Sequence, residues 1–230
     1  MANGKVISIG NQKGGVGKST ITSLVANYIH NNYPDIKILV VDADDYQNSL
    51  IQIRNAEIEF NLQNDPDFDI NTLYHLDKID SADYPDQDES LRTEYDFIFI
   101  DFPGNLKQEG VTKTYMFIDH LFIPTGTSRM DLDSTLEFAN YFKEQVISLR
   151  KGFGLETSIH GFFNRVVKSS IEFKQMFKEK HILPIPFLDN YITESPATFQ
   201  RYVSTINSYQ NETHNNYEDF CKELINIIKK

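Results

Sequence analysis

Short apolar runs alternate along this chain with longer segments of mixed character. Such runs lie at 6–9, 36–41, 97–100, 120–124 and 158–163, with few polar residues inside them. Runs that are apolar at nearly every position are typical of strands covered on both faces, as in a parallel sheet. The pattern therefore predicts five such strands spread over most of the chain.

The segments between these runs show helical spacing of apolar residues. Helices are predicted at about 19–28, from about 48, at 130–149, at 169–179 and at the end of the chain. The helix at 130–149 is expected to face the sheet with Leu132, Leu136, Phe142, Val146 and Leu149. The last helix carries an apolar stripe of Tyr217, Phe220, Cys221, Leu224, Ile225 and Ile228. Residues 182–187, which include two prolines, are predicted as an edge strand.

Between residues 52 and 94 the pattern is weak, and only short helices and loops are predicted. Residues 57–96 hold thirteen acids against Lys78 and Arg92, which equals the net charge of −11 of the whole chain. We interpret this acidic segment as a solvated face. Residues 150–180 carry seven bases against three acids, so one face of the protein is expected to be basic.

Strands alternating with helices over 230 residues predict an α/β fold, with a mostly parallel central sheet and helices on both faces. We expect a single domain that covers residues 1–230. The lone cysteine, Cys221, excludes a disulfide framework within one subunit. The first strand begins close to Met1, which leaves no room for a signal peptide, so a cytoplasmic protein is expected.

The segment 12–20 reads Gln-Lys-Gly-Gly-Val-Gly-Lys-Ser-Thr and lies between the first strand and the first helix. Glycines in this context let successive backbone N–H groups point at an anion, and the helix adds its positive end. The pattern predicts a phosphate-binding loop (P-loop) for ATP and Mg²⁺, in which Lys18 meets the β- and γ-phosphates and the Ser19 hydroxyl ligates the metal. The expected nucleotide-binding residues are Lys13, Gly14, Gly15, Val16, Gly17, Lys18, Ser19 and Thr20.

Two features of this loop depart from the usual P-loop pattern. Gln12 replaces its first glycine, and a second lysine, Lys13, follows. The loop thereby resembles the deviant Walker motif of the ParA/MinD family of P-loop ATPases. The resemblance implies an ATP-dependent homodimer in which Lys13 reaches the partner subunit's ATP. The simpler alternative is a glycine-rich turn that only tightens the connection.

Carboxylates follow two of the apolar runs, where open α/β sheets place their ligand chemistry. Asp42 and Asp44 resemble the family's Asp-x-Asp pair, which implies that Asp42 supports the hydrated Mg²⁺ and Asp44 positions the attacking water. The chain continues 45–47 as Asp-Tyr-Gln, without the family's proline and one residue longer. The alternative is that these acids cap the next helix.

Two further positions, Asp101 and Asn164, match the family's pattern. Asp101 closes an apolar run, as expected of a Walker B aspartate that holds Mg²⁺ through water. Gly104 follows it and is expected to bring a backbone N–H to the γ-phosphate. The family places an asparagine after a later strand to recognise adenine, which implies this role for Asn164; a turn residue is the alternative.

The resemblance implies a ParA-like ATPase that partitions plasmid, chromosomal or mobile-element DNA with a ParB-like adaptor. The residues 42–49 are also similar to ParA-like proteins of conjugative elements. Nonspecific DNA binding is expected through bases such as Lys168, Lys174 and Lys178, unless these form an ordinary solvated face. The final helix is expected to pack in the core and not to anchor the protein in a membrane.

Three other functions remain open at this point. One is a MinD-like positioning ATPase, and another is a small-molecule ligase of the dethiobiotin synthetase type, which shares the fold and the loop. The third is a nucleotide-gated scaffold that binds ATP without turnover, because the segment after Asp44 is altered. Phosphate release that depends on a small substrate, and not on DNA or a partner protein, would favour the ligase. Tight ATP binding without phosphate release, even with the adaptor, would favour the scaffold.

Overall fold

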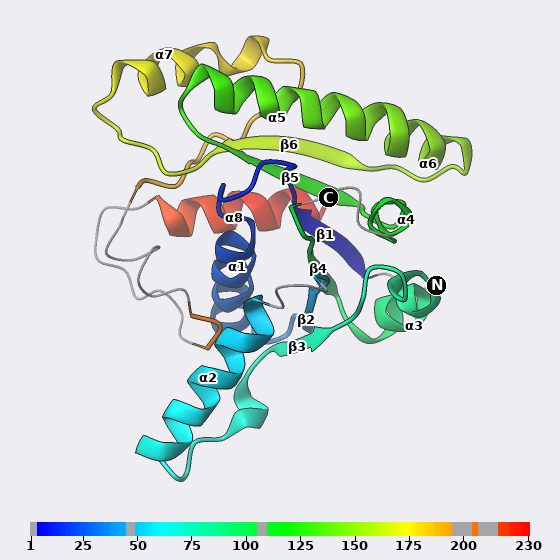
Figure 1. Ribbon diagram of the computed structural model, residues 1–230, viewed down its shortest axis with the longest axis vertical. Helices are drawn as coiled ribbons and strands as arrows, with labels where there is room; N and C mark the ends of the chain where they lie inside the picture. The colour runs from blue at the N-terminus through cyan, green and yellow to red at the C-terminus, as the bar shows by residue number, and fades with distance from the viewer. Residues whose placement is uncertain (1–3, 45–48, 105–109, 195–203, 207–215) are drawn as a thin grey trace.

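A six-stranded parallel β-sheet forms the centre of the molecule (Figure 1). Its strand order is β3-β2-β4-β1-β5-β6, and all neighbouring strands run in the same direction. The strands are β1 (Lys5–Ile9), β2 (Ile38–Asp42), β3 (His75–Lys78), β4 (Phe97–Asp101), β5 (His120–Thr125) and β6 (Ser158–Phe163). The computed structural model describes residues 4–44, 49–104, 110–194, 204–206 and 216–230.

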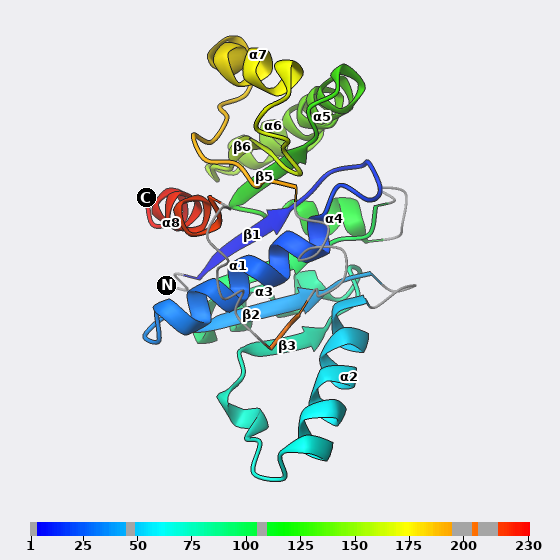
Figure 2. The same cartoon turned by 90° about the vertical axis from the view of Figure 1, so that its left-hand side faces the viewer.

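Helices connect the strands and lie on both sides of the sheet (Figures 1 and 2). They are α1 (Lys18–Asn32), α2 (Ser49–Asn64), α3 (Tyr84–Glu94), α4 (Val111–Tyr115), α5 (Arg129–Phe142), α6 (Ser148–Gly152), α7 (Ile171–Glu179) and α8 (Tyr217–Ile228). Two 3₁₀ turns, η1 (Ile70–Thr72) and η3 (Lys180–Ile182), and a π-helical segment, η2 (Lys143–Ile147), complete the described elements. The predicted α/β class is confirmed.

Alternate side chains of each central strand enter two different cores. In β4, Phe97 and Phe99 pack with α1 and α8, whereas Ile98 and Ile100 pack with α3, α4 and α5. This two-residue period follows from the pleat of the strand. Because both faces are covered, the strand is apolar at every position except its last, Asp101.

The apolar stripe of α8 lies in the core, as the sequence predicts. All six of its residues are buried, and the rings of Phe220 and Phe162 lie 4.9 Å apart. Full burial of a large apolar side chain stabilises the fold by about 1.5–3 kcal/mol. In the parts of the chain that the structure describes, no helix has both the length and the apolar character of a membrane span.

Three sequence predictions need correction. Residues 182–187 form no strand, because their prolines lack N–H groups, and Phe187 makes only one isolated bridge to Gly161 of β6. The region after residue 52 contains more than short helices and loops, since α2 runs to Asn64 and β3 pairs with β2. Leu149, expected in the core, is 56% exposed.

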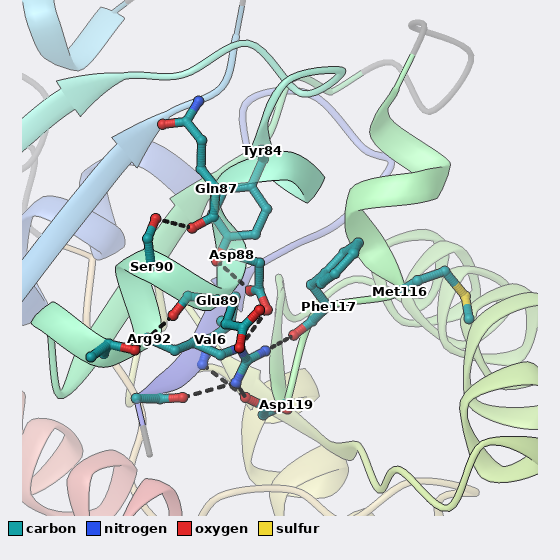
Figure 3. A network of polar contacts seen from close by, with 12 residues as sticks. Val6, Tyr84, Gln87, Asp88, Glu89, Ser90, Arg92, Met116, Phe117 and Asp119 are labelled. Atoms are coloured by element: carbon teal, nitrogen blue, oxygen red, sulfur yellow. Dashed lines mark hydrogen bonds and ion pairs between the residues drawn. The ribbon is translucent and has the colours of Figure 1, made fainter. Parts of the chain in front are cut away.

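A network of charged groups lies at the amino ends of the central strands (Figure 3). Asp119 accepts hydrogen bonds from Arg92 at 2.5 Å, from Arg150 at 2.8 Å and from the Val6 N–H at 3.0 Å. Arg92 also pairs with Asp88 at 2.7 Å. Arg150, counted above among the bases of a surface face, is in fact 2% exposed and neutralised by Asp119.

Beside this network, the buried His120 is expected to make the fold sensitive to acid. Burial lowers the pKa of His120 to about 4, and Lys5 acts in the same direction while Asp119 opposes it. Since the unfolded chain binds this proton near pH 6.5, stability is full above pH 6.5 and falls as the pH drops towards 4. This one group accounts for about 3 kcal/mol of the loss.

Urea unfolding at pH 7 and pH 4 measures this effect, with His120→Gln as the comparison. The variant is expected to lose about 3 kcal/mol less than the wild type over this range. An equal loss in both proteins would show that His120 does not carry the effect.

Candidate functional site

The loop between β1 and α1 has the backbone shape of a phosphate cradle. Gly15 and Gly17 have φ angles of 72° and 94°, in the left-handed region that residues with a side chain rarely adopt. Helix α1 begins directly after Gly17, so its free N–H groups and positive dipole end face the loop. A Cβ on Gly14 or Gly15 would meet no atom within 4 Å, so these glycines border open space.

Lys18 lies at the centre of this site. It is only 9% exposed, and burial lowers its pKa while the Asp101 and Asp44 carboxylates act in the opposite direction. A Cβ on Gly104 would lie 3.6 Å from the Lys18 Nζ atom, which places the segment after β4 beside the ammonium group. The predicted P-loop lysine, the two aspartates and Gly104 are therefore together in space.

Asp101 ends β4 beneath the loop and is 2% exposed. Burial raises its pKa to about 7; a hydrogen bond with Ser19 opposes the shift and Asp42 adds to it. Its Oδ1 atom is buried and has no hydrogen-bond partner among the described residues. Such an oxygen is costly to bury unless another group completes it.

Asp42 ends β2 and lies next to Asp101 in the sheet register. It is 1% exposed, and its Oδ2 atom accepts the backbone N–H groups of Leu50 and Ile51 at 3.0 and 3.1 Å. Burial raises the pKa of Asp42, although these backbone hydrogen bonds oppose the shift. Asp42 therefore caps α2, the alternative role that the sequence left open, from a buried position beside Asp101.

The residues around Asp101 fit a magnesium ion. Mg²⁺ prefers oxygen ligands, and the site offers the Ser19 hydroxyl and two buried carboxylates, whose pKa values are raised mainly by burial and whose charged forms a cation would favour. Within the described ranges, no group of three or more His, Cys, Asp or Glu side chains converges as a complete metal site. Phosphate oxygens and water would supply the remaining ligands, as is usual for this ion.

Lys13 is partly exposed and forms an ion pair with Asp131 in the first turn of α5. Partial burial works to raise the pKa of Asp131, but Lys13 and Ser128 together hold it below its ordinary value. Ser128 caps α5 by accepting the Asp131 N–H and donates its hydroxyl to the Asp131 carboxylate at 2.7 Å. Within one subunit, Lys13 is thus paired with α5, whereas Lys18 is buried near Asp101.

Asn11 was not singled out from the sequence, yet it fixes the start of the loop. It is 2% exposed and donates to the Pro124 carbonyl at 2.9 Å and to the Thr135 hydroxyl at 3.1 Å. Its side-chain Oδ1 atom accepts the Lys13 N–H at 3.0 Å. Asn11 therefore ties the Lys13 backbone to β5 and α5.

Asn164 follows β6 and packs against the P-loop. Its side-chain Nδ2 atom donates to the Val16 carbonyl at 2.8 Å, and its side-chain Oδ1 atom accepts the Arg165 N–H at 3.0 Å. A Cβ on Gly17 would lie 2.7 Å from the Asn164 Nδ2 atom, so only glycine fits there. Asn164 also lines a cavity of about 320 Å³ together with Lys13 and Asp131.

Two further features lie away from the loop. Lys174 and Lys178 on α7 are exposed, as the predicted basic face requires, and Lys168 contacts the Asn216 side chain at 3.2 Å. A larger cavity of about 700 Å³ lies at the amino ends of β1, β5 and β6. It contains none of the predicted site residues.

The predicted residues 45–47 lie outside the described part of the chain.

A family model described as an AAA domain matches residues 4–84 of this chain. The matched part runs from β1 to the start of α3 and includes the P-loop, Asp42 and Asp44. A comparison with curated protein sequences gives no match.

Solved structures match nearly the whole chain. One is described as a plasmid partition protein from Borrelia burgdorferi B31 bound to AMPPNP, with 20% identity, a TM-score of 0.68 and coverage of 99% of this chain and 98% of the other. A ParA family ATPase from Chlorobium tepidum has 20% identity, a TM-score of 0.62 and coverage of 97% and 100%. The MinD cell division protein of Aquifex aeolicus has 17% identity, a TM-score of 0.68 and coverage of 96% and 97%.

The fold and the loop thus define an α/β protein with the fold of the P-loop NTPases. The predicted resemblance to ParA and MinD proteins is confirmed at the level of the fold, over almost the full length of the chain.

Proposed function

We propose that this chain is a ParA-like ATPase that forms an ATP-dependent dimer and uses hydrolysis to partition DNA. The observation that carries the proposal is the position of two lysines on one loop. Lys18 is buried beside Asp101, whereas the Lys13 side chain is 41% exposed and pairs with Asp131 on α5. The plasmid partition protein that matches this fold supports the assignment of DNA as cargo.

ATP is proposed to bind with its phosphates in the P-loop. Backbone N–H groups from Gly14 to Thr20 surround the phosphates, and Lys18 contributes its positive charge to the β- and γ-groups. Ser19, Asp42 and Asp101 would hold Mg²⁺, which when bound neutralises charge on the phosphate oxygens. Asn164 is proposed to lie near the adenine ring.

Dimerisation is proposed to place Lys13 on the partner subunit's γ-phosphate. To do so, Lys13 must leave Asp131 of its own subunit. A partly exposed ion pair contributes only about 0–1 kcal/mol, whereas a charge-assisted bond to a phosphate contributes about 1.5–3 kcal/mol. The exchange is therefore favourable once a nucleotide faces the lysine.

Asp44 is proposed to orient the water that attacks the γ-phosphate. It follows β2 directly, is half-buried, and lies close enough to Lys18 to affect its pKa. Chemistry of this kind depends on positioning and charge neutralisation. After hydrolysis the γ-phosphate no longer bridges the subunits, and the dimer is expected to separate.

DNA and an adaptor protein complete the proposed cycle. The exposed Lys174 and Lys178 would contact phosphates without sequence preference, so DNA binding should weaken steeply with salt. A ParB-like adaptor is proposed to stimulate hydrolysis and so couple dimer separation to the movement of cargo.

Asp44→Ala is expected to lower the rate of phosphate release by about 100-fold, because the attacking water loses its orienting carboxylate. Affinity for a fluorescent ATP analogue should stay within about threefold of the wild type, since Lys18 and the loop are unchanged. Phosphate release with ATP, DNA and the adaptor measures the effect.

Asp133→Ala provides the matched control, because Asp133 is an exposed carboxylate on α5. Its rate should equal that of the wild type. Wild-type protein that binds ATP tightly but never releases phosphate would instead support the non-hydrolysing scaffold.

A further inference from the structure

Residues 55–73, here called the acidic arm, project from the rest of the molecule (Figures 1 and 2). The arm consists of the outer part of α2, the turn that follows and η1. None of its residues is buried, although most of them lie in regular helical structure or defined turns. The fold itself therefore gains little apolar burial from this segment.

The arm nevertheless carries many apolar side chains. Phe60 is 65% exposed, Ile70 is 44% exposed and Leu62 is 40% exposed. The other apolar members, none of them buried, are Ala56, Ile58, Phe68 and Leu73. Where exposed apolar groups form one patch rimmed by polar residues, they mark a surface for a partner.

The charge of the arm restricts the kind of partner. The arm has no Lys or Arg, and its acids are Glu57, Glu59, Asp65, Asp67 and Asp69. This charge repels nucleic acid, anionic lipid and the same arm of a second copy. A segment with both apolar and basic side chains would complement the surface in both respects.

The arm is also connected to the nucleotide site through α2. This helix is continuous from Ser49 to Asn64, about 24 Å, and its first turn donates two N–H groups to Asp42. Arg54 fixes its middle by donating to the Tyr74 carbonyl at 3.0 Å and to the Thr205 hydroxyl at 2.9 Å. A partner that contacts the arm therefore contacts one end of α2, and the other end of the same helix is capped by Asp42.

We propose that the acidic arm is the docking site for a basic, amphipathic segment of a partner protein. Binding of this segment is transmitted along α2 to Asp42 and changes the affinity of the site for nucleotide. The second part rests on the proposed function, whereas docking itself does not.

A fluorescein-labelled helical peptide of about 18 lysines and leucines, with leucines along one face, serves as the probe. Its affinity for the full chain is measured by fluorescence anisotropy without nucleotide. Glu59→Lys/Asp67→Lys is expected to weaken binding at least about 10-fold, because two attractive charges become repulsive. Phe60→Ser should weaken it about fivefold through lost apolar contact.

Matched controls separate the arm from the general negative charge of the protein. Glu137→Lys/Glu144→Lys changes the net charge equally at exposed sites on α5 and η2, and Ile171→Ser removes an apolar side chain that is 78% exposed. Both should bind the peptide within about twofold of the wild type. Equal weakening by both charge reversals, or no binding by the wild type, would overturn the docking site.

Two further readouts complete the test. Concentration-dependent self-association that Phe60→Ser abolishes would show that a second copy covers the arm, and would overturn the partner proposal. Saturating peptide should change the wild-type affinity for a fluorescent ATP analogue at least about threefold, and Phe60→Ser should need about fivefold more peptide for the same change. Bound peptide with no such change would overturn the relay. A chain that binds no nucleotide even without peptide would instead count against the proposed function.

Discussion

Lys18→Gln is expected to weaken binding of a fluorescent ATP analogue by about 100-fold. The substitution removes the buried ammonium group and with it the proposed charge-assisted hydrogen bonds to two phosphates, which together contribute about 3 kcal/mol. The remaining loop N–H groups still face the anion, so weak binding should persist. Titration of the analogue by fluorescence, with Mg²⁺ present, measures the change.

The control is Lys174→Gln, which removes an exposed lysine on α7 and should leave nucleotide affinity unchanged. Thermal unfolding without nucleotide should show that Lys18→Gln still folds, because glutamine suits an α-helix. Equal affinities of Lys18→Gln and wild type for the analogue would exclude the P-loop as the nucleotide site.

Lys13→Gln is expected to keep nucleotide binding within about threefold of the wild type but to abolish the ATP-dependent dimer. Binding is kept because Lys13 pairs with Asp131 within its own subunit and contributes little to that subunit's site. The dimer is lost because the partner's γ-phosphate no longer meets a lysine. Sedimentation with ADP and with a non-hydrolysable ATP analogue measures the monomer and dimer fractions. Wild type and Asp44→Ala should both form a dimer with ATP, and Asp44→Ala should remain dimeric longest.

Asp131→Asn tests the intrasubunit ion pair separately. It removes the carboxylate that holds Lys13 but keeps the lysine, so the dimer fraction should equal or exceed that of the wild type. A dimer that is lost in Asp131→Asn but kept in Lys13→Gln would reverse the assigned roles of the two side chains.

The central part of the fold was predictable from the sequence because both faces of the sheet are covered. β4 is the clearest example, since its buried pattern leaves a run of apolar residues that ends in Asp101. β3 gave no such signal, because it is an edge strand whose residues His75, Asp77 and Lys78 are exposed. Its pairing with β2 depends on backbone hydrogen bonds, which leave no trace in side-chain pattern.

The helix ends and the edge of the sheet were less predictable for local reasons. The helix predicted at 130–149 contains the π-helical segment η2. The wider turn rotates the side chains that follow it about the helix axis, so Leu149 lies on the exposed face. Around residues 182–187 the apolar pattern resembled a strand, but the prolines allow only one bridge to β6. In both places a local backbone feature, the π-helical segment or the prolines, set the structure in spite of the apolar spacing.

At the site, the sequence predicted which side chains lie together, but not the hydrogen bonds and ion pairs that fix their positions. The loop, Asp42 and Asp101 follow strands that end at the same edge of the sheet, so their meeting follows from the topology. Asn11 and Asp131 were missed because their partners are more than 100 positions away in sequence. Only the folded chain brings α5 beside the P-loop and shows that Lys13 has a partner within its own subunit.

Phosphate release from mixtures of Lys13→Gln and Lys18→Gln tests the central claim most directly. If each Lys13 completes the other subunit's site, a mixed dimer contains one complete site, although neither variant has one alone. An equal mixture at high protein concentration should then recover up to about a quarter of wild-type activity. Mixtures that never exceed the activity of the separate variants, at any ratio, would show that the two lysines serve the same subunit.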